Sequence, residues 1–73
     1  MKFSYKTTAG TFFIILRDGR YLPTFDGEAL GSYASPQQAA SDLAGGHTFT
    51  PSNGVDTALL GIPEEIYEWT MEE

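Results

Sequence analysis

The sequence predicts an α+β domain in which a small three- to four-stranded antiparallel sheet carries one α-helix on one face. Three observations predict this class: two apolar runs joined by Asp18-Gly19, helix signals over residues 35–46, and an alternating apolar pattern over residues 66–71. We expect residues 1–73 to form a single domain, whose folding buries only roughly 60% of the surface of the unfolded chain. The chain has no cysteine, so apolar burial, helped by ten aromatic residues, must hold the fold together.

The two apolar runs predict a β-hairpin. Residues 11–17 and 20–25 are rich in β-branched and aromatic side chains, and the Asp-Gly pair between them suits a type I′ turn, which needs positive φ at both central positions. Pro23 has no N–H to donate to a ladder. We therefore expect the second strand to turn the Pro23 side to an edge or a bulge.

Two further strands are expected on weaker patterns. A second Asp-Gly pair, at 26 and 27, directs the chain into a third strand near residues 29–34. Tyr67, Trp69 and Met71 alternate with Ile66, Glu68 and Thr70, which predicts a last strand over 66–71 with one buried face. Residues 1–9 either start a strand at Phe3 and Tyr5 or fray as a chain terminus.

The helix over residues 35–46 is specified at both ends. Ser35 caps it, Pro36 suits its first position, and Gln38 occupies the capping-box position. Gly45 or Gly46 permits the left-handed residue that ends a helix. The side chains expected to face the sheet are small or aliphatic: Ala39, Ala40, Leu43 and Ala44.

The segment after residue 55 is expected to be a turn or a short helix. Asp56 or Thr57 can cap it, and Leu59, Leu60 and Ile62 are then expected to point inward.

The first predicted strand is apolar on both faces. Phe12, Ile14 and Leu16 share one face, while Phe13 and Ile15 on the other are equally apolar. One helix covers only one face of a small sheet, so the second face is closed either by the loop 47–63 or by a partner or second copy. The apolar residues of that loop, Phe49 and Val55 among them, favour closure by the loop.

Charge is divided along the chain. The first twenty residues carry all four basic side chains against one aspartate, a net +3, whereas residues 21–73 carry nine carboxylates and no Lys or Arg. An acidic surface repels a phosphate backbone, so we expect no nucleic-acid partner. Either the basic third packs beside the acidic remainder, or an acidic face attracts a basic partner.

We expect no membrane partner and a cytoplasmic location. No apolar run approaches the roughly 20 residues that span a bilayer, and the first residues lack the apolar run of a secretory signal.

His47, the only histidine, lies in a loop of glycines, hydroxyls and an asparagine, GGHTFTPSNGVDT. Its pKa range suits proton transfer, but no GxSxG-type signature accompanies it. A metal site needs three or four donors, and the acidic clusters do not match a calcium loop. We therefore expect no catalytic residue, metal ligand or cofactor, and an imidazole that bonds the last carbonyls of the helix.

The stretch LGSYASPQQAASDLAGGH resembles the GYF-type adaptor domains, particularly their short bacterial variants. Gly31, Ser32 and Tyr33 stand at the family's Gly-Pro-Tyr step, with serine in place of proline, and Phe12 and Phe13 stand at its paired aromatics. The resemblance implies a bacterial adaptor that binds proline-rich peptides.

The sequence thus predicts a small protein-interaction domain rather than an enzyme, with a protein or peptide partner or a second copy. A self-associating structural protein and a small enzyme using His47 remain alternatives. The candidate partner-binding residues are Phe13, Ile15, Tyr33, His47, Phe49 and Trp69.

Overall fold

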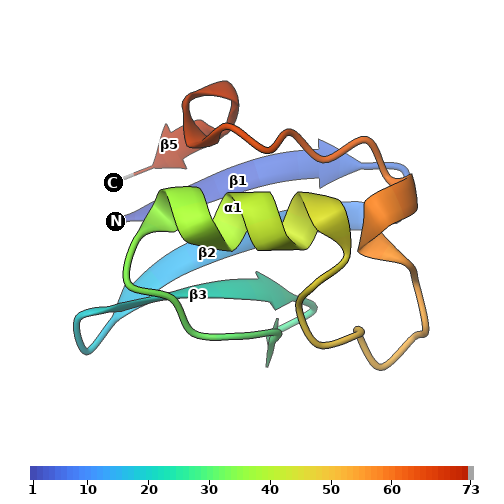
Figure 1. Cartoon of the computed structure of the whole chain (residues 1–73), viewed down its shortest axis with the longest axis horizontal. Coiled ribbons are helices and arrows are strands. Elements are labelled where there is room, and N and C mark those ends of the chain that lie inside the picture. The colour runs from blue at the N-terminus through green and yellow to red at the C-terminus, as the bar shows by residue number, and fades with distance from the viewer. Residues whose placement is uncertain (73) are drawn as a thin grey trace.

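The computed structural model describes residues 1–72 as a five-stranded antiparallel sheet with one α-helix against one face (Figure 1). The order of strands across the sheet is β4-β3-β2-β1-β5. The predicted α+β class is confirmed, with five strands instead of three or four. The elements are β1 (Lys2–Thr7), β2 (Gly10–Arg17), β3 (Arg20–Phe25), β4 (Glu28–Ala29), α1 (Pro36–Gly45), β5 (Thr70–Glu72) and two 3₁₀ turns, Thr57–Leu59 and Ile66–Glu68.

The hairpin of β2 and β3 forms as predicted. Asp18 and Gly19 have φ values of 52° and 77°, so both central positions are left-handed, as a type I′ turn requires. The turn sets the register, in which Arg17 faces Arg20 and Ile15 faces Leu22.

Residues 2–7 form a strand, which decides between the two alternatives for the start of the chain. β1 lies between β2 and β5 and pairs with both. Phe3 and Tyr5 stand opposite Ile14 and Phe12, on the face that carries the core. Ladder bonds on both sides hold this segment in the sheet.

The third predicted strand, 29–34, is wrong in extent, because β4 has only two residues. The Leu30 N–H donates to the Pro23 carbonyl at 2.7 Å, but Pro23 has no N–H to return. The Leu30 carbonyl instead accepts the Phe49 N–H at 2.9 Å. The ladder ends there, and the chain rejoins β3 only at an isolated bridge between Tyr33 and Tyr21.

The last predicted strand, 66–71, is wrong in its first half. The Glu68 and Trp69 N–H groups donate to carbonyls three residues earlier, which makes a 3₁₀ turn and shifts the faces of the side chains. Trp69 is buried as expected, and its indole N–H donates to the Pro63 carbonyl at 3.2 Å. Tyr67 is 80% exposed and Met71 56% exposed, so they do not share its buried face.

The helix is confirmed at both ends. Ser35 Oγ accepts the Gln38 N–H at 3.2 Å, and Gly46 closes the helix with φ 76°. The bond from the Gln38 N–H is the half of the predicted capping box that the structure shows. The neighbouring Gln37 side chain binds another segment: its amide nitrogen donates to the Glu64 carbonyl and its amide oxygen accepts the Ile66 N–H, both at 3.0 Å. These two bonds attach the start of the second 3₁₀ turn to α1.

One core lies between α1 and the sheet. Its buried residues are Phe12, Ile14, Phe25, Leu30, Ala39, Ala40, Leu43, Ile62 and Trp69. Phe12 and Phe25 stack with ring centroids 4.4 Å apart. Ala44 is half-buried at the edge of the predicted helix stripe.

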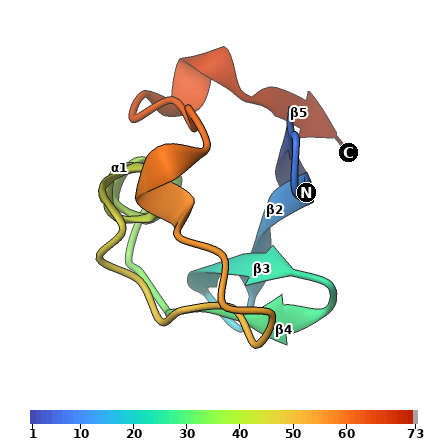
Figure 2. The same ribbon diagram turned by 90° about the vertical axis from the view of Figure 1, so that its right-hand side faces the viewer.

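The loop 47–63 packs on the helix side of the sheet, which corrects the expectation that it covers the second face (Figure 2). Val55 and Leu60 lie against the same core as Phe12, and Ile62 belongs to it. Asp56, not Thr57, caps the 3₁₀ turn by accepting the Ala58 N–H at 3.0 Å. Leu59, expected to point inward, is 79% exposed.

Candidate interaction surface

The face of the sheet opposite α1, called the outer face below, carries an apolar strip. Paired residues in an antiparallel ladder point to the same face, and neighbours along a strand point to opposite faces. Because Phe12 and Ile14 are buried under α1, Phe13 and Ile15 point outward, and Leu22 joins them as the partner of Ile15. Figure 2 shows no other element of the described chain on this side of the sheet.

The apolar strip, Phe13, Ile15 and Leu22, is contiguous and half-buried. Ile15 and Leu22 form a cross-strand pair, and Phe13 lies two residues along β2 from Ile15. Short polar side chains flank Phe13, with Thr24 opposite it on β3 and Ser4 on β1. These side chains shield one another, but none of them closes the strip from above.

The same register places all four basic residues on the outer face. Lys2 and Lys6 pair with the outward Ile15 and Thr11, and Arg17 and Arg20 pair with each other. The Lys2 Nζ lies 4.9 Å from the centroid of the Phe13 ring, within the range of a cation–π contact. The Arg20 guanidinium donates to the hydroxyl and the carbonyl of Ser32, at 2.9 and 3.0 Å.

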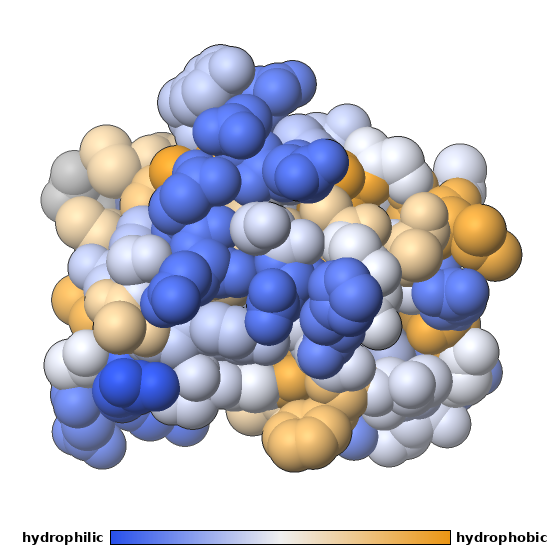
Figure 3. Space-filling model, in the orientation of Figure 1, coloured by the Kyte–Doolittle hydropathy of each residue, from blue (hydrophilic) through white to orange (hydrophobic). Residues whose placement is uncertain are grey.

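Figure 3 shows the opposite side of the molecule, where hydrophilic residues run across the middle over α1. Five carboxylates belong to α1 and to the segments packed beside it: Asp42, Asp56, Glu64, Glu65 and Glu68. The two faces of the domain therefore differ in charge, with the basic residues on the outer face and these five carboxylates on the helix side.

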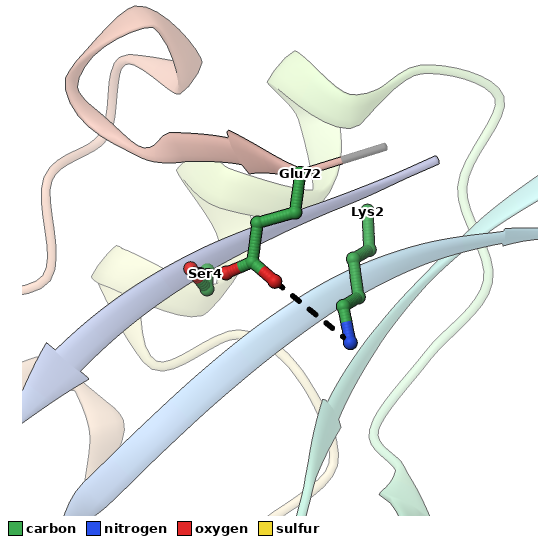
Figure 4. Close-up of polar contacts among 3 residues, drawn as sticks. All are labelled: Lys2, Ser4 and Glu72. Carbon is green, nitrogen blue, oxygen red and sulfur yellow. Dashed lines mark hydrogen bonds and ion pairs between the residues drawn. The ribbon is translucent and has the colours of Figure 1, made fainter.

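On the outer face, side chains of β1 and of the edge strand β5 form a polar cluster of Lys2, Ser4 and Glu72 (Figure 4). The Ser4 hydroxyl donates to Glu72 Oε2 at 2.6 Å, and the Lys2 Nζ lies 3.9 Å from Glu72 Oε1. The ion pair is largely exposed and contributes little, whereas the short hydrogen bond involves a nearly buried hydroxyl. The cluster attaches the three-residue strand β5 to β1.

The six candidate residues predicted from the sequence do not form one site. Phe13 and Ile15 lie together on the outer face. Tyr33, His47 and Phe49 belong to segments on or beside the helix side, and Trp69 is buried in the core. Trp69 has only 5% of its surface available to a partner.

His47 ends the helix through its backbone, which corrects the role expected for its imidazole. Its N–H donates to the Asp42 carbonyl at 2.8 Å, beside the bond from the Gly46 N–H to the Leu43 carbonyl. This pair of bonds is a Schellman motif. The imidazole lies over Gly45, where an added Cβ would be 2.7 Å from a ring carbon.

Tyr33 has the most altered titration in the described chain. Burial, followed by the neighbouring Asp42 carboxylate, raises the pKa of the phenol to about 12. Its ring lies against Gly31, where an added Cβ would be 2.8 Å from a ring carbon. Tyr33 thus packs the chain entering α1 against the helix and is unsuited to proton transfer near neutral pH.

The loop after α1 encloses a shallow hollow of about 330 Å³, lined by Phe49, Pro51, Val55, Asp56 and Thr57 among others. Asp56, its carboxylate, is engaged in capping the 3₁₀ turn. Outside this hollow, Glu28 accepts the Ser52 N–H at 2.8 Å and the Ser52 hydroxyl at 2.9 Å. These two bonds lower the pKa of Glu28 and attach the loop to β4.

The sequence pattern did not predict that Leu22 and the basic residues belong to this surface, although the register of the hairpin gave a signal for Leu22. A two-residue turn at Asp18-Gly19 pairs Arg17 with Arg20, and every earlier position then pairs in step. That register alone places Leu22 beside Ile15. The position of Lys2 and Lys6 depended on recognising β1.

Comparisons of the chain with protein-family models, with curated proteins and with solved structures found no match. Within residues 1–72, no helix is long and apolar enough to cross a membrane. The same residues bring no three His, Asp or Glu side chains together as a metal site.

Proposed function

We propose that this chain is a small non-enzymatic protein-interaction domain that binds its partner through the outer face of the sheet. One observation carries the proposal: Phe13, Ile15 and Leu22 form a contiguous apolar strip that no other element of residues 1–72 covers. A cluster of three large apolar side chains with a polar rim has the composition of an interaction surface.

The polar groups support a binding rather than a catalytic role. The carboxylates of Glu28, Asp56 and Glu72 each accept hydrogen bonds that attach a turn or an edge strand. His47 acts through its backbone. A cytoplasmic location belongs to the same proposal and agrees with a fold that uses no cysteine.

Photo-crosslinking from two positions tests the proposal. A photoreactive residue replaces Leu22 on the outer face or, as the matched control, the exposed Leu59 on the helix side. We expect a discrete adduct from position 22 alone, which excess unlabelled wild-type protein suppresses and an excess of the double variant Phe13→Ser, Ile15→Ser does not. Equal adducts from both positions, or equal suppression by both competitors, would contradict the proposal.

Folding of the double variant is checked by circular dichroism and thermal unfolding. Neither residue belongs to the core between α1 and the sheet, so we expect the fold to persist. A photoreactive residue at position 15 with the single variant Phe13→Ser as competitor repeats the test with a smaller change.

A further inference from the structure

The occupant of the outer face can be defined further by charge. The start of β1, the end of β2 and the start of β3 meet at one end of the sheet, and this end carries Lys2, Arg17 and Arg20. Lys6 lies at the other end of β1. The apolar strip therefore has cations beyond both of its ends, with Glu72 beside Lys2 as the carboxylate of β5 on this face.

We infer that the outer face receives an acidic amphipathic helix of a partner protein, with apolar side chains on the strip and carboxylates toward the cations at both ends. The inference rests on the proposed function. A helix would complete a third layer, since α1, a helix of 10 residues, and the loop 47–63 both lie on the inner face of the same sheet. Opposite charges at the rim steer such a partner and fix its orientation.

Charge argues against a second copy as the occupant. Two outer faces packed about a two-fold axis would bring cations against cations in either orientation, because both ends of the strip are basic. Nucleic acid is less favoured because Phe13 is the one aromatic ring on the strip for bases to stack on, and Arg20 is engaged with Ser32.

Three synthetic peptides of roughly four helical turns test the inference, each with the same leucine stripe and with Glu, Gln or Lys at all other positions. They are titrated into the isotope-labelled full chain, and NMR shifts of Phe13, Ile15 and Leu22 are followed. We expect the Glu peptide to shift these signals at the lowest concentration, and its affinity to fall by about tenfold when salt rises to about 0.5 M. The Gln peptide should bind more weakly and the Lys peptide should leave the outer face unshifted.

The double variant Lys6→Gln, Arg17→Gln should bind the Glu peptide about three- to tenfold more weakly and the Gln peptide unchanged. Glu64→Gln, on the helix side, is the matched control and should not weaken either complex. The two proposals fail separately. Equal binding of the Glu and Gln peptides to the outer face would overturn the acidic partner but keep the binding surface. A lack of shifts on the outer face with all three peptides would also overturn the acidic partner.

Three further measurements bear on the occupant. Tighter binding of a single-stranded oligothymidylate or of phosphatidylglycerol vesicles to this face would overturn the inference. So would a dimer of twice the 8.0 kDa chain mass in sedimentation equilibrium that the variant Phe13→Ser, Ile15→Ser dissolves. Photo-crosslinking from position 22 still decides the proposed function in each case.

Discussion

The Leu30 carbonyl accepts the Phe49 amide because Pro23, its neighbour on β3, has no N–H to offer. This one exchange ends β4 after two residues and draws the loop after α1 to the edge of the sheet. The bond thus attaches the start of the loop 47–63 to the edge of the sheet.

Replacing Pro23 with valine should restore a competing donor. The new N–H faces the Leu30 carbonyl, so we expect the Phe49 amide to exchange with solvent several-fold faster in hydrogen-exchange measurements. The Gly54 amide, bound to the Pro51 carbonyl at 2.8 Å, is the internal control and should keep its protection. Unchanged protection of Phe49 would contradict this account of the edge.

Leu30→Ala should destabilise the domain severely. Leu30 is fully buried, and removing such a side chain costs about 2 to 5 kcal/mol. A chain of this size has a free energy of unfolding of about 4 to 11 kcal/mol, so the variant should be only marginally folded at 25 °C. Urea unfolding measures the loss, and Leu59→Ala, at a 79% exposed position, should stay within about 0.5 kcal/mol of the wild type.

Gly46→Ala should cost more than Gly61→Ala. Both glycines have positive φ, 76° and 70°, and so carry a strain of about 1 to 2 kcal/mol when an L side chain is added. At Gly46 the new Cβ would also lie 3.0 Å from the Ala58 Cβ, whereas nothing lies within 4 Å at Gly61. Equal urea-unfolding midpoints for the two variants would show that the contact between the new Cβ and Ala58 does not destabilise the fold.

The Glu28 carboxylate should stabilise the fold at neutral pH, and this stabilisation should be lost in acid. The Ser52 N–H and hydroxyl lower the pKa of Glu28 from its ordinary 4.5. A lowered pKa in the folded state stabilises the fold fully above the unfolded value, and the stabilisation is lost as pH falls through the folded one. The difference in stability between wild type and Glu28→Gln should therefore shrink as the pH falls below about 4.5, and NMR titration of the Glu28 carboxyl gives the folded pKa directly. A midpoint at or above 4.5 would contradict the two bonds.

Tyr33 should make the domain less stable at alkaline pH. Its pKa is raised from 10.0 to about 12, so the unfolded chain releases this proton first and stability is lost as pH rises from about 10 to 12. Absorbance of tyrosinate near 295 nm should contain a component with a midpoint of about 12. That component should vanish in Tyr33→Phe and move to lower pH in Asp42→Asn; persistence in Tyr33→Phe would refute the assignment.

Local signals in the sequence predicted the parts of this fold that depend on neighbouring residues. The turn at Asp18-Gly19 and the caps at Ser35 and Gly46 formed as expected, because each is determined within a few residues. The GYF-type resemblance and the partner classes stay predictions.

The errors arose where distant contacts decide. Residues 66–68 follow the strand period but form a 3₁₀ turn, attached to α1 through Gln37. The side taken by the loop 47–63 depends on long-range contacts, since Val55, Leu60 and Ile62 pack against the core and the Phe49 N–H binds the Leu30 carbonyl. The candidate surface was half predicted: Phe13 and Ile15 were named, whereas Leu22 and the basic rim needed the register of strands that were not all recognised.

The separation of charge between the two faces has a consequence for motion in solution. The four cations lie on one side of the shortest dimension of the molecule, 18 Å across, and five carboxylates lie on the other, so the domain has an electric dipole directed through its sheet. Such a body rotates in the field of a charged object at separations of about 8 to 10 Å at physiological salt. An anionic partner therefore meets the strands first, and a cationic surface meets the helix.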